Sequence, residues 1–85
     1  MPYIVQAQRD LIDYPLKMLM TYIKTPGDMA YAITKLILFY LHQYGKNYST
    51  LASVHGILGT VRDEFYHRVV RPYEQEKEKE NGDVF

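Results

Sequence analysis

The stretch that decides the fold runs over residues 28–44 and reads DMAYAITKLILFYLHQY. Its apolar side chains recur at the three- and four-residue spacing of a helix, and the stripe consists of Met29, Ile33, Leu36, Ile37, Tyr40 and Tyr44. Leu38, Phe39 and Leu41 add apolar surface outside that stripe. A helix that is apolar on nearly every side lies at the centre of a fold or between subunits. We therefore predict a central helix over residues 28–44 and a homo-oligomer.

Two further helices are predicted around this segment. Asp13 is a preferred N-cap residue, and the apolar face that follows it, Leu16, Leu19, Met20 and Ile23, predicts a helix over residues 13–24. A coiled-coil-like seam of Leu51, Val54, Leu58, Val61 and Phe65 predicts a helix over residues 49–71. Residues 72–80 mix charges without an apolar face, and residues 72–85 are expected to form a charged tail. The predicted fold is a small all-α three-helix bundle in one domain, with a short N-terminal segment and a charged C-terminal helical extension.

Composition and charge exclude several classes of partner. No cysteine is present, which excludes disulfides and thiolate zinc sites. Residues 1–72 hold eight basic and five acidic residues, a net charge of +3, and residues 73–85 hold two and five, a net charge of −3. The ten basic and ten acidic residues therefore balance, whereas proteins that bind long nucleic acids carry a basic surplus. We expect no signal peptide, membrane span or membrane partner, because the apolar runs are short.

Motifs for catalysis and metal binding are sparse. The sequence holds no Gly-x-Ser-x-Gly and no glycine-rich phosphate loop. Glu64 and His67 match part of a di-iron motif of helical bundles, but the bridging carboxylates that such a site needs are missing. We read these residues as surface pairs, Glu64 with Arg68 and Asp63 with His67. The sequence therefore predicts no enzyme, no metal and no cofactor.

Polar residues set among apolar ones are candidates for ligand binding. They are Tyr31, Lys35, His55, Arg62, Tyr66 and Arg68. An arginine fork matches a phosphate group, and a tyrosine ring can stack on a base, so the set suits a nucleotide-sized anion. The alternative interpretation is that Lys35 extends to solvent and Arg62 pairs with a surface acid. Arg68 also suits the dipole at the end of a helix, which is a sufficient structural reason for it.

Two glycines interrupt the third predicted helix. Gly56 and Gly59 each cost about 1 kcal/mol relative to alanine in a helix interior. Close approach of another helix or of a ligand would offset that cost. The alternative is that both are tolerated surface glycines.

Short motifs over nearly the whole chain carry a family resemblance. They are Met1–Ile4, Gly27-Asp28, Tyr31–Leu36, Tyr48-Ser49, Leu51, Gly56, Glu64–Tyr66, Arg68–Val70, Pro72–Glu74 and Glu80–Val84. With them the sequence resembles a family of short uncharacterised proteins encoded by tailed bacteriophages and prophages. It departs from that pattern at His67, where arginine is expected, and at Phe85, where tyrosine is expected. The family has no assigned activity, so the resemblance implies only a phage accessory protein in the host cytoplasm.

These features together predict a non-catalytic, anti-defence protein. It would sequester a small nucleotide-like signalling molecule of host immunity in a pocket at a homo-oligomer interface. Lys35 and Arg62 would contact phosphate, Tyr31 and Tyr66 would stack on a base or line the pocket, and His55 would bind a sugar or base. The alternative is an inhibitor or adaptor that binds a host protein through exposed tyrosines, and a third possibility is a structural part of the virion.

Overall fold

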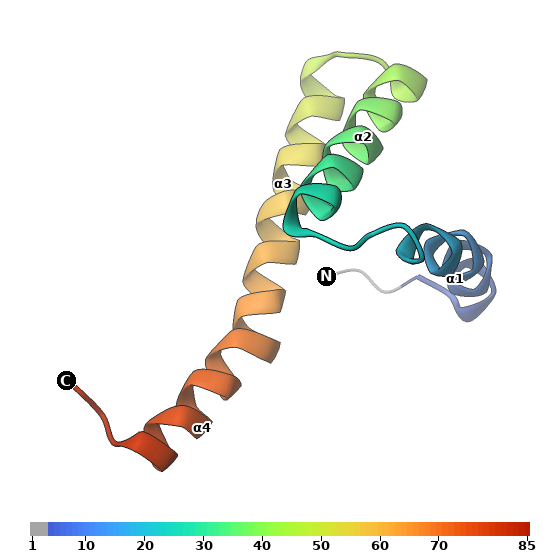
Figure 1. The fold of residues 1–85 in the computed structure, drawn as a ribbon. Helices are drawn as coiled ribbons and strands as arrows, with labels where there is room; N and C mark the ends of the chain where they lie inside the picture. Colours follow the sequence, from blue (N-terminus) through green and yellow to red (C-terminus); the bar gives the residue numbers. More distant parts are fainter. Residues whose placement is uncertain (1–3) are drawn as a thin grey trace. The chain divides into compact units, whose positions relative to one another are not determined.

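The computed structural model describes residues 4–85, and all regular structure in this range is helical. The elements are α1 (Gln6–Met20), α2 (Pro26–Tyr44), α3 (Tyr48–Phe65), the π-helix η1 (Tyr66–Val70) and α4 (Arg71–Asn81), which Figure 1 follows from blue to red. The all-α prediction is therefore confirmed. The chain divides into two compact units, a first unit up to Leu51 and a second unit over Ala52–Phe85.

The first helix begins earlier than the sequence predicts. The expected span was 13–24, but α1 runs over Gln6–Met20, so Asp13 lies inside the helix and does not cap it. The residues before Asp13 are mostly good helix formers, and the Arg9 Nε donates a hydrogen bond of 2.8 Å to the carbonyl of Ile4 at the start. Pro15 also lies inside the helix, although it has no N–H to donate.

The start of α2 is fixed by a capping box. Thr25 is the N-cap, and its Oγ1 accepts a hydrogen bond of 3.1 Å from the N–H of Asp28. The Asp28 carboxylate accepts in return from the N–H groups of Thr25, at 3.2 Å, and Lys24, at 3.0 Å. The helix therefore begins at Pro26, two residues before the expected start, because a proline at the first position has no N–H to leave unpaired.

The end of α2 and the start of α3 are joined by a short turn. Gly45 follows α2 with φ of 93°, a conformation that favours glycine, and its N–H donates to the carbonyl of Leu41 at 2.8 Å. The Asn47 Oδ1 then accepts a hydrogen bond of 3.0 Å from the N–H of Thr50, which satisfies one free donor at the start of α3.

From Tyr48 to Asn81 the helical segments follow one another without a gap, so the helix passes Pro72 instead of ending before it. A proline in an α-helix lacks the N–H for the carbonyl four residues back, here Arg68, and its ring crowds that carbonyl. The turn before Pro72 is widened, and the N–H of Arg71 donates to the carbonyl of Tyr66, five residues back. The π-helix η1 therefore lets the helix continue into α4.

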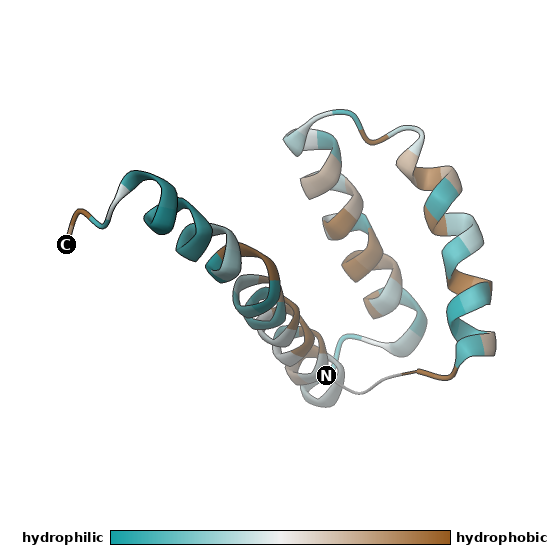
Figure 2. Cartoon of the chain, turned by 90° about the horizontal axis from the view of Figure 1, so that it is seen from below, coloured by the Kyte–Doolittle hydropathy of each residue, from teal (hydrophilic) through white to brown (hydrophobic). Residues whose placement is uncertain are grey.

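None of the described side chains is buried. The second unit is one run of helix with a short tail, and a single helix cannot enclose side chains. In the first unit, α1 and α2 bring no Cα atoms within 8 Å of one another. Figure 2 shows apolar colour along α2 and hydrophilic colour along α4. Each unit by itself thus lacks a core, and packing as a three-helix bundle stays a prediction.

The length and apolar character of the described helices bear on membrane crossing. Within residues 4–85, none of them combines the length and the apolar character that a bilayer span needs.

Candidate functional site

The clearest side-chain cluster on α2 surrounds Lys35. Its Nζ lies 5.8 Å from the ring centroid of Tyr31 and 5.6 Å from that of Phe39, which are distances for cation–π attraction. The two rings lie one turn before and one turn after the lysine, so the helix itself positions all three. Lys35 is half-buried, whereas Tyr31 and Phe39 are 66% and 64% exposed. The helix therefore presents a positioned ammonium group between two open aromatic faces, a geometry suited to a phosphate beside a stacked base.

Phe39 is the member of this cluster that the sequence analysis did not single out. Phe39 lies four residues after Lys35 and eight after Tyr31, and this spacing predicts that the three side chains share one face of the helix. These contacts run along the exposed surface of the helix and are compatible with the interpretation that Lys35 extends to solvent.

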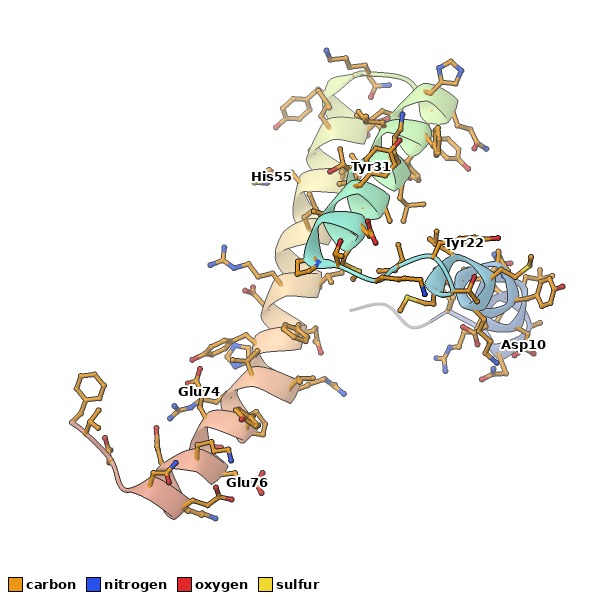
Figure 3. The ribbon with its side chains drawn as sticks, viewed as in Figure 1. Asp10, Tyr22, Tyr31, His55, Glu74 and Glu76 are labelled. Carbon is orange, nitrogen blue, oxygen red and sulfur yellow. The ribbon has the colours of Figure 1, made fainter. Side chains whose placement is uncertain are left out.

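The second set of candidates lies along one side of α3 and η1. His55, Arg62 and Tyr66 are seven and four residues apart, which keeps them on one stripe of the helix. His55 projects from the side of α3 in Figure 3. Among residues 4–85, no acid lies within ion-pair distance of Arg62, so the expected surface pair is not formed there. The Tyr66 ring contacts the His67 ring edge to face, with centroids 5.4 Å apart.

Arg68 has a structural partner. Its Nε lies 2.6 Å from the Glu64 carboxylate, as the spacing of four residues predicts. The pair is partly exposed, so it contributes little to stability, but it holds the Arg68 side chain along the helix. The same ion pair involves Glu64, which belongs to the partial di-iron motif. Within residues 4–85, no three side chains that could ligate a metal ion lie close together.

The candidates thus form two sets, one on each unit. Tyr31 and Lys35 contact one another on the first unit, and the other four line the helix of the second. That all six contribute to one pocket stays a prediction.

One groove within the described second unit lies away from all six candidates. It has a volume of about 330 Å³ and lies between α4 and the C-terminal tail, with Tyr73, Glu74, Glu78 and Asp83 among its lining residues. Lys77 also lines it, with its Nζ 5.5 Å from the Tyr73 ring centroid and 3.1 Å from the Glu80 carboxylate. Its acids outnumber its single lysine, so this groove repels an anion, and it contains none of the six candidates.

Comparison with known proteins identifies a family for nearly the whole chain. A family model described as "Domain of unknown function (DUF6899)" matches residues 1–84. No curated protein and no solved structure matches the chain.

Proposed function

The chain belongs to the DUF6899 family, whose function is unknown, and from its own residues we propose that it binds and sequesters a small nucleotide-like anion without catalysing a reaction. Its working form in this proposal is a homo-oligomer, and the ligand lies at the contact between copies. The motif resemblance to phage and prophage proteins adds the setting, which is the host cytoplasm during an immune response that uses nucleotide signals.

The observation that supports the proposal is the set of large apolar side chains that each unit, described by itself, leaves open. Large apolar residues stay open on each unit, including Leu36 at 67% and Phe65 at 58%. Burial of such side chains is the main force that holds a fold together. Association of copies would cover these faces, and it would also turn open helix surfaces into an enclosed pocket.

The chemistry of the open faces favours a nucleotide. Lys35 sits between the rings of Tyr31 and Phe39, and Arg62 shares a stripe with Tyr66. Each set offers a cation for phosphate and a ring for a base. The proposal of binding without turnover rests on the sequence, which holds no Gly-x-Ser-x-Gly and no glycine-rich phosphate loop.

Calorimetric titration with ADP-ribose and with a cyclic dinucleotide tests this proposal. The oligomer should bind at least one of them, and Lys35→Ala and Arg62→Ala should each weaken binding at least about tenfold. Lys46→Ala makes the same change of charge in the turn after α2 and should bind as the parent does. Chromatography of the nucleotide after incubation should show no product. Failure of the parent oligomer to bind either nucleotide, or binding by both variants as tight as that of the parent, would contradict the proposal.

The second candidate function is binding of a host protein. Several tyrosines stand far into solvent, with Tyr22 76% and Tyr48 88% exposed, and tyrosine is enriched in protein interfaces. If this function is correct, Tyr22→Ser or Tyr48→Ser will reduce capture of one defined host protein, and neither change will affect nucleotide binding.

A further inference from the structure

One side of α2 carries a row that consists of a ring, an ammonium group and a second ring. Tyr31, Lys35 and Phe39 follow one another at a spacing of four residues. The Lys35 Nζ lies 5.8 Å from the Tyr31 ring centroid and 5.6 Å from the Phe39 ring centroid. All three residues belong to one helix of the first unit, so these contacts are set within α2 alone. Because the two distances are almost equal, a phosphate bound to the ammonium has one ring on each side of it along the helix.

The row lies away from the apolar stripe of α2. At about 100° per residue, its three members lie between about 110° and 170° round the helix from the centre of that stripe. Burial of the stripe, by this chain or by a second copy, therefore uses another side of α2 than the one that carries the row. A ligand can bind the row without competing with the packing of the stripe.

The spacing of the two rings determines how many bases the row can hold. Tyr31 and Phe39 are eight residues apart, which is about 12 Å along the helix axis. Two rings that sandwich a single base are roughly 7–8 Å apart, twice the contact distance between carbon atoms. Each ring therefore suits a base of its own, and Lys35 supplies a cation midway between the two bases.

We infer that this row takes a dinucleotide. The phosphate that links the two nucleosides lies on the Lys35 ammonium, and one base stacks on each of Tyr31 and Phe39. The inference rests on the proposed function and narrows its ligand from nucleotide-like anions in general to ligands with two bases. It makes Phe39 a specificity-determining residue, because Tyr31 and Lys35 alone satisfy a single nucleotide.

Two ligands of equal charge test this inference. The first is adenylyl-adenosine, a dinucleotide with two bases and one phosphodiester, and the second is the same molecule with one base removed. In calorimetric titration of the full chain, the dinucleotide should bind at least about fivefold more tightly, because stacking of the second base contributes that much or more. Equal binding of the two ligands would show that the second base makes no contact, and would overturn the inference.

Substitution of the rings tests which side chains hold the bases. Phe39→Leu removes a ring but keeps an apolar side chain, and the preference for the dinucleotide should fall below about twofold, as it should in Tyr31→Leu. Phe39→Tyr keeps a ring and should retain the preference, as should Tyr22→Leu, which removes a ring between α1 and α2. The preference is a ratio, so a general loss of fold, which weakens both ligands together, does not imitate this result. A preference that Phe39→Leu leaves unchanged overturns the inference.

The outcomes for the parent chain separate this inference from the proposed function. Binding of ADP-ribose or of a cyclic dinucleotide, by a parent that does not prefer adenylyl-adenosine to its analogue, overturns the assignment of two bases and leaves the proposed function standing. Failure of the parent to bind any of these four ligands overturns both.

Discussion

At the scale of single residues, Asp28 sets the boundary of α2. Hydrogen bonding to its carboxylate lowers its pKa below the ordinary value, first through the backbone N–H of Lys24, against an opposing effect of burial, with smaller contributions from Thr25. The helix predicted over residues 28–44 starts at Asp28, because aspartate is a preferred N-cap residue. The signal for the correct boundary was present, since Thr25 and Asp28 have the three-residue spacing of a capping box and Pro26 suits the first helical position.

Removal of the Thr25 hydroxyl tests the capping box. Thr25→Ala should lower the free energy of unfolding by about 1 kcal/mol, because the N–H of Asp28 loses its acceptor. Thr25→Ser keeps the hydroxyl and should stay close to the parent. Urea denaturation followed by circular dichroism measures both, and equal stability of the alanine and serine variants would show that the cap contributes nothing.

The lowered pKa of Asp28 predicts a dependence of stability on pH. A carboxyl group whose pKa is lower in the folded state stabilises the fold above its ordinary pKa, and this contribution is lost as the pH falls through the lowered value. Thermal melts of the parent and of Asp28→Asn should therefore differ at neutral pH and converge in acid. A constant difference over the whole range would mean that the carboxylate charge is not the stabilising feature.

The contacts around Lys35 on α2 show how much of the candidate site follows from the sequence. The i, i+4 spacing of Tyr31 and Lys35 predicts that they are neighbours, and the structure places the Lys35 Nζ near the Tyr31 ring. Phe39 extends the cluster at the same spacing. Contacts along one helix are thus predictable from spacing alone. Contacts between α2 and α3 depend on tertiary packing, so the sequence could not establish a joint site for Lys35 and Arg62.

At the scale of elements, the helical segments were largely predictable and the boundary at Pro72 was not. Proline favours an end to the preceding α-helix, and that rule predicts a break before Pro72. The structure replaces the break with the wider turn η1. On the far side, α4 has favourable charge pairs, with Arg71 3.8 Å from Glu78 and Lys77 3.1 Å from Glu80. The start of α1 was not predicted correctly, because its first turns consist of helix-forming residues and no side chain caps them to mark the boundary.

Replacement of the proline tests the origin of η1. Pro72→Ala restores an N–H that can donate to the carbonyl of Arg68, so the turn should tighten to an α-helix and the free energy of unfolding should rise by about 1–3 kcal/mol. Pro26→Ala is the matched control, because proline at the first helical position forgoes no helical hydrogen bond, and it should give little gain. Amide hydrogen exchange over residues 66–72 reports the tightening, and unchanged protection there would contradict this explanation of η1.

At the scale of the whole molecule, the apolar pattern of residues 28–44 predicts a helix that is covered on nearly every side. Neither unit by itself provides that cover. The lack of buried side chains in residues 4–85 agrees with that pattern. A hydrophobic pattern shows that a face is to be covered, but not by which partner, since apolar burial is non-directional. This is why the sequence predicts an oligomer without giving the number of copies or their arrangement.

Self-association predicts that stability depends on protein concentration. Because folded copies stabilise one another by mass action, the melting temperature should rise with protein concentration, as it does for obligate oligomers. Differential scanning fluorimetry over a hundredfold range of concentration measures this shift. A melting temperature independent of concentration would indicate that one copy folds alone, and the proposed interface pocket would lose its basis.

The most direct test of the central claim is native mass spectrometry of the protein purified gently from cells with an active nucleotide-based immune response. We predict an oligomer that carries extra mass of nucleotide size, released unchanged when the protein is denatured. Arg62→Ala should give the same oligomer without the extra mass. A monomer, or an oligomer that stays free of bound nucleotide in such cells, would contradict the claim that copies of this chain sequester a nucleotide between them.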